Sequence, residues 1–199
     1  MAQPPALPPL TYAFSPLPKY ADEINLNADV LAAYTSSVLG AITEEGDDNN
    51  YGSSVLNDVA CLQALSKRIH FGKFVAEAKY REAPSAFDGA IAARDAAAIM
   101  AALTYPSQEA AVAARVGRKA AAFAASRADD LPGGPSAAAQ CRVTPGAVSA
   151  LWVDVVMPLT KRVQVAYLLR RHEAAEAPGQ PGRFAAGHAN GSGPPGGFI

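Results

Sequence analysis

Two cations lie eleven residues apart in a segment with helical periodicity. They are Arg68 and Lys79, in the stretch SKRIHFGKFVAEAKY at residues 66–80. Eleven steps of ~100° return to nearly the same helix face, about 16 Å along the axis. The residues between them on that face, Gly72, Val75 and Ala76, are small or compact. The pattern predicts a depression with a positive charge at each end, which suits a small dianion, although such spacing more often marks two solvated charges on an amphipathic helix.

A hydroxyl and an amide share one stripe of a second helical segment. Thr160 and Gln164 are four residues apart among Val and Leu residues, so they lie on the same helix face. Buried polar groups need hydrogen-bond partners. A ligand could supply them, or a neighbouring helix whose register they fix. Taken alone, the segment slightly favours the second interpretation.

Glu109 and His70 are weaker candidates. Glu109 lies in the first turn of a predicted helix, where the helix dipole favours an acid in any protein. His70 is close to Arg68 in sequence but points away from Lys79 on the helical wheel, so a packing or surface role is expected. The sequence has no nucleophile triad, phosphate loop or metal-ligand spacing. Neither a metal nor a cofactor is expected.

The first half of the chain is predicted to be an extended arm followed by two helices. Residues 1–20 carry six prolines and should form the arm. Asn27 can cap a helix over residues 28–43. After a charged break, Ser53 or Ser54 can cap one long helix over residues 54–82, because apolar residues recur there at three- and four-residue steps.

Prolines mark the starts of the later helices. Pro84 suits the first turn of a helix to residue 103, and Pro106 suits that of an Ala-rich helix to about residue 126. Residues 128–140 lack periodicity and should form a surface loop. Thr144 should cap a final helix, which Pro158 should kink. Residues 174–199, rich in Gly and Pro, are expected to be disordered. The prediction is an all-α helical bundle over residues 21–173.

Composition excludes several classes of function. The chain has 199 residues, 50% of them hydrophobic, which fits one domain. Lys plus Arg number 17 against 18 Asp plus Glu, so nothing in the overall charge favours nucleic acid or a membrane surface and anion binding must be local. There is no membrane-spanning run or secretory signal. Cys61 and Cys141 lack CxxC spacing, and reduced thiols in an intracellular compartment are expected.

Two long segments resemble the chorismate mutases of eukaryotes. Residues 50–80, NYGSSVLNDVACLQALSKRIHFGKFVAEAKY, look like the signature helix of that family, and residues 157–171, MPLTKRVQVAYLLRR, look like its C-terminal helix. Residues 102–120 and the part before residue 50 also fit, nearer to plant and algal members than to yeast. The resemblance covers about residues 8–173. It implies an all-helical isomerase that rearranges chorismate to prephenate for phenylalanine and tyrosine biosynthesis.

The resemblance also implies a role for each candidate residue. Arg68 is expected to bind a substrate carboxylate, Lys79 to donate to the ether oxygen and a carboxylate, and Glu109 to bind the ring hydroxyl. Thr160 should line the pocket. Gln164 should be the second donor to the ether oxygen, where fungal relatives carry a Glu that must be protonated. Because an amide donates at any pH, activity should vary little between pH 5 and 8.

The chain departs from the family pattern at two points. Family members begin with a helix that supplies another catalytic arginine, and nothing before Leu10 can be that helix. One carboxylate clamp is therefore expected to be lacking, and activity to be weak or absent, with a truncated gene model preferred over a natural pseudoenzyme. Tyr105 stands where yeast-type members have an Asn in the pocket.

Regulation and assembly are further implications of the resemblance. Asn49, Gly52 and Ser53 match residues that hold an aromatic amino-acid effector (Trp, Tyr or Phe) at a dimer interface, and Thr144 matches an allosteric switch. A helix entry and a cap would explain the same residues without an effector. A homodimer is expected. Likeness to plastid-type members favours a plastid location, as an alternative to the cytoplasm. The rival functions are an inactive relative with a regulatory role and an Ala-rich helical interaction protein.

Overall fold

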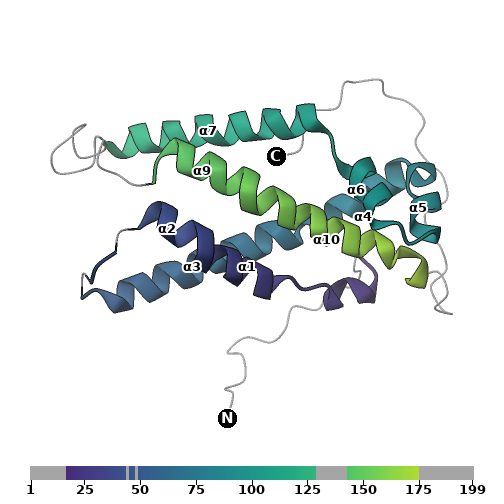
Figure 1. Cartoon of the computed structure of the whole chain (residues 1–199), viewed down its shortest axis with the longest axis horizontal. Coiled ribbons are helices and arrows are strands. Elements are labelled where there is room, and N and C mark those ends of the chain that lie inside the picture. Colours follow the sequence, from purple (N-terminus) through teal and green to yellow (C-terminus); the bar gives the residue numbers. More distant parts are fainter. Residues whose placement is uncertain (1–16, 44, 48, 129–142, 175–199) are drawn as a thin grey trace, which may run out of the picture.

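The computed structural model describes residues 17–43, 45–47, 49–128 and 143–174. Every regular element in these ranges is a helix (Figure 1), so the prediction of an all-α fold is confirmed. Most of the predicted arm, the loop after residue 128 and the tail from residue 175 lie outside the described residues. None of the described helices is long and apolar enough to cross a membrane.

The first described element is a short 3₁₀ helix, η1 (Lys19–Glu23). Its residue Tyr20 is 8% exposed and its ring lies 5.3 Å from that of Tyr167. The predicted arm, which extended to residue 20, therefore ends earlier. The apolar side chains of this turn add enough buried surface to hold it against the bundle.

Three consecutive segments form the next helix: α1 (Asn27–Ala33), a π-helical turn η2 (Tyr34–Val38) and α2 (Leu39–Ile42). The expected cap at Asn27 is wrong, because the helix already begins at that residue. The Asn27 side chain instead accepts a hydrogen bond from the Ser66 hydroxyl at 2.6 Å. His70 Nε2 accepts the backbone N–H of Leu26 at 2.9 Å, so His70 fixes the entry to this helix.

The predicted helix over residues 54–82 is two helices, α3 (Tyr51–His70) and α4 (Gly72–Glu82). They join at Phe71, whose backbone stays near helical geometry. Since α3 begins at Tyr51, Ser53 and Ser54 lie inside its first turn and are not caps. The Ser54 N–H is bonded to the Asn50 carbonyl.

The segment predicted as one helix from Pro84 to residue 103 is three short helices: η3 (Pro84–Ala86), α5 (Asp88–Ala92) and α6 (Ala96–Leu103). The break between α5 and α6 contains Arg94, which has a left-handed φ of 53°. Asp95 then caps α6 by accepting the N–H groups of Ala97 and Ala98. No local pattern in the sequence marks this break, because the stretch is rich in alanine, which favours a continuous helix.

The last helices carry the prolines where they were expected. Helix α7 spans Pro106–Ala128 and α9 spans Pro145–Leu151, with the Thr144 hydroxyl accepting the Ala147 N–H as its cap. A π-helical turn η4 (Trp152–Val156) leads into α10 (Met157–Leu169), and the 3₁₀ turn η5 (Arg171–Ala174) follows. The helical irregularity therefore lies immediately before Pro158, whose ring crowds the carbonyl one turn earlier.

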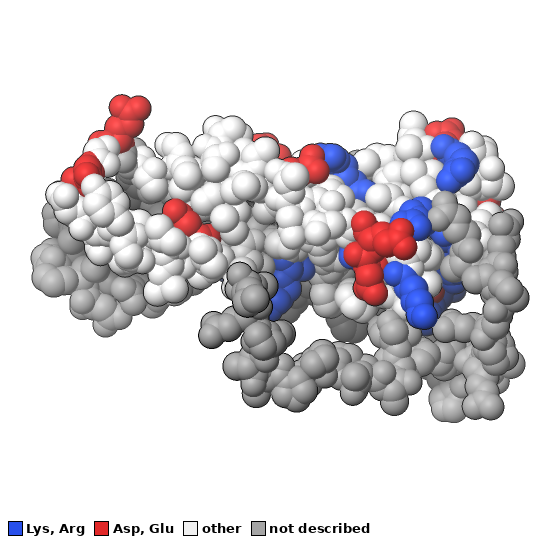
Figure 2. All heavy atoms as spheres, turned by 90° about the horizontal axis from the view of Figure 1, so that it is seen from below, with Lys and Arg blue, Asp and Glu red and all other residues white. Residues whose placement is uncertain are grey.

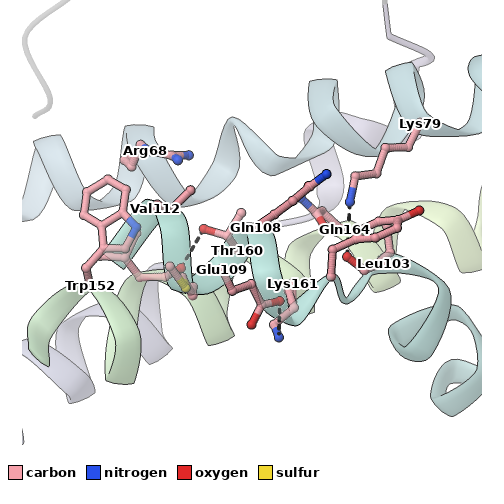
Figure 3. A pocket seen from close by; sticks show the side chains of 13 residues that line it. Arg68, Lys79, Leu103, Gln108, Glu109, Val112, Trp152, Thr160, Lys161 and Gln164 are labelled. Atoms are coloured by element: carbon pink, nitrogen blue, oxygen red, sulfur yellow. Dashed lines mark hydrogen bonds and ion pairs between the residues drawn. The ribbon is translucent and has the colours of Figure 1, made fainter. Parts of the chain in front are cut away.

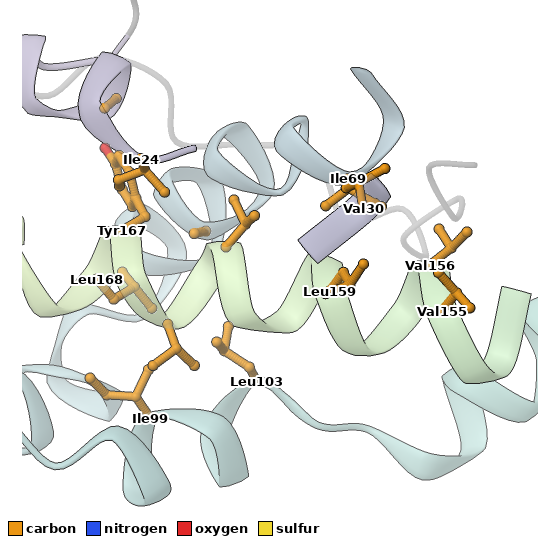
Figure 4. Close-up of a cluster of buried hydrophobic side chains, with 14 of the residues drawn as sticks. Ile24, Val30, Ile69, Ile99, Leu103, Val155, Val156, Leu159, Tyr167 and Leu168 are labelled. Atoms are coloured by element: carbon orange, nitrogen blue, oxygen red, sulfur yellow. The ribbon is translucent and has the colours of Figure 1, made fainter. Parts of the chain in front are cut away.

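Helix α10 lies at the centre of the bundle, against α3, α4 and α6 (Figure 4). Its side chains Val163, Tyr167 and Leu168 are fully buried. Helix α7 runs beside α9. At the crossing of α4 and α10, a Cβ on Gly72 would stand 3.0 Å from the Thr160 carbonyl oxygen and 3.1 Å from its methyl group. Only glycine allows this approach, which sets α4 against α10.

A buried carboxylate links α4, α10 and η5. Glu77 is 5% exposed. It accepts the Tyr167 hydroxyl at 2.7 Å, Arg81 Nε at 2.7 Å and Arg171 Nε at 3.0 Å. Such a charge is tolerated in a core because hydrogen bonds and opposite charges replace its water.

Candidate active site

A pocket of about 170 Å³ opens where α3, α4, α7 and α10 meet. It contains all five residues singled out as catalytic candidates from the sequence. They are joined by eight others, so that the lining is Arg68, Lys79, Leu103, Tyr105, Gln108, Glu109, Val112, Trp152, Val156, Met157, Thr160, Lys161 and Gln164. Figure 3 shows Arg68 and Lys79 at opposite ends of the pocket, on the same side of it.

Arg68 forms one end of the pocket. Its guanidinium lies 5.0 Å from the centre of the Trp152 ring, and no carboxylate pairs with it within the described ranges. Burial lowers its pKa, because the charged form loses hydration. A partly buried guanidinium that has an aromatic face on one side and no counter-ion is well placed to bind a carboxylate in the forked geometry.

Lys79 forms the other end. Its ammonium donates to the Leu103 carbonyl at 3.1 Å and lies 4.7 Å from the centre of the Tyr105 ring. An ammonium has three N–H donors, so donors remain for a ligand. Burial lowers the pKa of Lys79 and the charge of Lys161 acts in the same direction, against the negative charges of Glu109 and Glu82.

Gln164 and Thr160 line the wall between the two cations. Gln164 is 6% exposed, and the described residues offer its amide no hydrogen-bond partner, although the group borders the pocket. The Thr160 hydroxyl donates to the Val156 carbonyl of its own helix at 2.6 Å. The alternative in which both residues bond a neighbouring helix is therefore not what the structure has. An unpartnered amide beside a pocket is available to a ligand.

Glu109 and Lys161 lie next to each other, on the side of the pocket opposite α3 and α4 (Figure 3). Lys161 Nζ donates to Glu109 Oε1 at 2.9 Å, with the side chains 22% and 33% exposed. The charges that line the pocket are thus Arg68, Lys79 and Lys161 against Glu109, which leaves a net charge of +2. That balance attracts a small dianion, and the partial burial of Arg68 and Lys79 strengthens the attraction relative to bulk water.

The small residues between Arg68 and Lys79 have a different role from the one predicted. Gly72 and Ala76 are buried against neighbouring helices, and neither they nor Val75 belong to the pocket lining. The depression expected there is filled by α10. The pocket lies beside this crossing, and the two long cationic side chains reach it from either end.

Several lining residues were missed by the analysis of the sequence alone. Trp152, Val156, Thr160 and Gln164 recur every four residues, so the polar stripe could have been followed back to Trp152. Tyr105, Gln108 and Val112 follow one another at steps of three and four residues, so they share one helix face beside Glu109. Lys161 had no such signal, because it follows Thr160 directly and basic residues are common on exposed helix faces.

The four residues expected to hold an effector do not lie in this pocket. Asn49 precedes α3 with a left-handed φ of 56°, and Gly52 and Ser53 lie in the first turn of α3. Thr144 caps α9. All four are exposed, and no hydrogen bond joins Thr144 to the other three in the part of the chain that is described. His70 is also outside the lining. No group of three or more potential metal ligands occurs among the described residues.

The family model described as chorismate mutase type II matches residues 54–165, which include Arg68, Lys79, Glu109, Thr160 and Gln164. The chain belongs to this family. The match covers more than half of the sequence and includes α4, α7 and most of α3 and α10, the helices that build the pocket.

Individual chorismate mutases match over a longer stretch. "Chorismate mutase 1, chloroplastic" from Petunia hybrida is 45% identical over 169 residues, which are 84% of this chain and 51% of the petunia protein. "Chorismate mutase 2, cytosolic" from Zea mays is 39% identical over 171 residues, which are 83% of this chain and 66% of the maize protein. The chain thus spans about half the length of its chloroplastic relatives.

Solved chorismate mutase structures share the fold. An enzyme from Candida albicans in complex with L-Trp superposes with a TM-score of 0.74 at 36% identity, over 86% of this chain and 62% of that one. A structure named AtCM1, with phenylalanine bound in an allosteric site, gives a TM-score of 0.73 at 42% identity, over 84% and 64% of the two chains. Both agree with the all-helical prediction.

Proposed function

We propose that this chain catalyses the rearrangement of chorismate to prephenate. The observation that carries the proposal is the pocket with Arg68 and Lys79 at its two ends and a net charge of +2, in a member of the chorismate mutase family. Chorismate is a dianion of small size. Its two carboxylates match two cations that are held apart by α3 and α4.

Each pocket residue has a task in this reaction. The rearrangement is unimolecular: an ether C–O bond breaks while a C–C bond forms, so no nucleophile or general base is needed. Arg68 binds one carboxylate. Lys79 binds the other carboxylate and, together with Gln164, donates a hydrogen bond to the ether oxygen, on which negative charge develops. Glu109 accepts a hydrogen bond from the ring hydroxyl, and Thr160 shapes the wall.

The rate enhancement comes from two physical effects. The pocket holds the substrate in the compact, chair-like shape that the transition state requires, so ordering is completed before reaction. Donors fixed in advance at the ether oxygen stabilise its developing charge, and removal of one such donor costs about 100-fold or more in rate. Lys79 is fixed by the Leu103 carbonyl and the Tyr105 ring, which is the preorganisation that this effect requires.

The test is a direct assay of chorismate loss and prephenate formation by absorbance. Weak activity is expected with one carboxylate clamp lacking, but the unmodified chain should still exceed the uncatalysed rate. Lys79→Ala should lower the rate by about 100-fold, or to the uncatalysed level if that is reached first. Arg162→Met is the matched control, since Arg162 is a neighbouring cation on α10 whose ion pair with Asp29 is exposed. Equal rates at the uncatalysed level for the chain and Lys79→Ala would overturn the proposal and favour a non-catalytic role.

We further propose that the chain forms a homodimer and binds aromatic amino acids. The first half of α3 supports the dimer, because Tyr51, Val55, Leu56 and Val59 are 63%, 61%, 70% and 45% exposed. Seen from the side of α1 and α3, this half of the molecule carries few charges (Figure 2).

Relatives with L-Trp or phenylalanine bound support the proposed effector binding. Titration with Trp, Tyr and Phe during the assay should change the rate; no response to any of them would overturn the proposed effector binding.

The compartment is proposed to be one of the two named for relatives, the chloroplast or the cytosol. The cytosol has the support of the cytosolic maize relative, and the plastid that of the chloroplastic relatives and of the similarity of Gly52 and Ser53 to plastid-type members. A fluorescent fusion of the gene product distinguishes the two by microscopy. Fluorescence in neither compartment would contradict both.

A further inference from the structure

Lys161 forms an ion pair with Glu109 in the wall of the pocket, and the proposed reaction gives Lys161 no role. Its ammonium lies 2.9 Å from Glu109 Oε1, with the lysine side chain 22% exposed. The pair joins the second turn of α10 to the first turn of α7. Water screens a partly buried ion pair less than an exposed one, so the attraction between its two charges is stronger.

The Glu109 carboxylate has a second cation within its electrostatic range. Among the charged groups that act on Lys79, Glu109 has the largest effect, ahead of Glu82 and Lys161, and it raises the Lys79 pKa. The Lys79 ammonium already donates to Leu103 and faces the Tyr105 ring. A carboxylate that moved to Lys79 would take the donor that the ligand needs.

We infer that Lys161 is a positioning residue that holds the Glu109 carboxylate away from Lys79 and so keeps the Lys79 ammonium available to the substrate. This inference rests on the proposed function, in which Lys79 donates to the ether oxygen. Lys161 touches Glu109, and no contact with the reacting atoms is proposed for it. By pairing with the Glu109 carboxylate, Lys161 prevents that carboxylate from pairing with Lys79.

The alternative is that Lys161 only joins α7 to α10. In that case Glu109 would stay where it is when Lys161 is replaced, and the two residues would affect Lys79 independently. If Lys161 restrains Glu109, its loss lets the carboxylate approach Lys79, and the effect of Glu109 on Lys79 grows. Non-additivity between the two substitutions therefore separates the two roles.

The first readout is the titration of Lys79 by NMR of isotope-labelled lysine side chains, assigned with a Lys79→Arg sample. It needs no substrate turnover. Glu109→Gln should lower the Lys79 pKa with Lys161 present, and should lower it at least about twice as far in the Lys161→Met background, because an unrestrained carboxylate comes closer. Lys161→Arg should behave as the unmodified chain. Equal decreases in the two backgrounds would overturn the inference.

The second readout is the kinetics of the same variants with chorismate. Lys161→Met should lower kcat by about 10-fold with a smaller change in KM, since a donor to the transition state is diverted. Adding Glu109→Gln to Lys161→Met should cause no further loss, although Glu109→Gln alone lowers the rate. Arg162→Met, which removes the adjacent Asp29 pair at 2.8 Å on the exposed side of α10, should leave kcat unchanged.

The two readouts distinguish failure of the inference from failure of the proposed function. Non-additive Lys79 titration without chorismate turnover by any variant would reject the proposed function and retain the restraint on Glu109. Turnover with additive titration would reject the restraint and retain the function. A kcat for Lys161→Met equal to that for Arg162→Met would also count against the restraint. Thermal unfolding of each variant identifies losses that come from a damaged fold.

Discussion

Gln164 is a buried residue whose amide has no partner among the described residues. An amide keeps its N–H donors at every pH, whereas a carboxylic acid donates only while protonated. The rate of the unmodified chain should therefore change less than about tenfold between pH 5 and 8. Gln164→Glu should remain active near pH 5 and lose activity toward pH 8 as the new carboxyl ionises. Rate against pH for both proteins measures this, and a steep fall in the unmodified chain would contradict the assigned role.

At the scale of residues, the sequence allowed the two ends of the pocket to be predicted but not its far wall. Arg68 and Lys79 share a helix face by spacing alone, and the break at Phe71 is mild enough to preserve that relation. The partner of Glu109 could not be predicted, because the contact with Lys161 joins residues 52 positions apart. The choice between a ligand and a neighbouring helix for Gln164 also depended on which helix α10 would face.

At the scale of elements, the crossing of α4 and α10 depends on Gly72. An alanine there would place its Cβ 3.0 Å from the Thr160 carbonyl oxygen, so one helix must shift. Gly72→Ala should destabilise the fold by about 1 to 3 kcal/mol, as overpacking does elsewhere. Urea unfolding measures the change. Gly40→Ala is the matched control, because nothing lies within 4 Å of a Cβ at that helical glycine, and its stability should be unchanged or raised by up to about 1 kcal/mol.

The contact between α10 and α4 also makes the fold sensitive to alkali. Burial and the hydrogen bond to Glu77 raise the pKa of Tyr167 above its usual value of 10.0. The folded chain therefore keeps a phenol proton that the unfolded chain loses above about pH 10, and stability must fall as the pH rises past that value. Between pH 9 and 11, Tyr167→Phe should lose about 1.4 kcal/mol less than the unmodified chain. Equal losses in urea unfolding would contradict this assignment.

The helix boundaries show where local patterns are insufficient. Prolines and the Thr144 cap allowed the starts of α7 and α9 to be predicted, because these residues act through their own backbone and side chain. The break before α6 was missed, since it is made by a left-handed Arg94 in an Ala-rich stretch. The predicted caps at Asn27 and Ser54 were wrong, because a residue that can cap a helix can also lie within its first turn.

At the scale of the whole molecule, the first half of α3 has a series of exposed apolar side chains. Val55 is 61% exposed, and burial of such a side chain against a second copy would contribute about 1.5 to 3 kcal/mol. Light scattering should give the mass of two chains for the unmodified protein and of one for Val55→Asp. Asn57→Asp adds the same charge two residues along the helix and should stay dimeric. A monomeric unmodified protein would contradict the dimer.

The overall class could be predicted because helical periodicity extends over most of the chain. The tertiary arrangement could not, since the position of α10 between α3, α4 and α6 depends on close approach at Gly72 and on the buried Glu77 network. Neither feature has a local pattern of its own. Resemblance to a family supplied the missing long-range information, and the family match over residues 54–165 agrees with it.

The most direct test of the proposed dianion pocket is the dissociation constant of prephenate, the dicarboxylate product, measured by calorimetry. Arg68 is proposed to bind one carboxylate, and a charge-assisted hydrogen bond is worth about 1.5 to 3 kcal/mol. Arg68→Met should therefore weaken binding about 10-fold or more, while Arg162→Met, on the exposed face of α10, should bind as the unmodified chain does. Equal affinity in all three proteins would contradict the claim that Arg68 and Lys79 form a pocket for a small dianion.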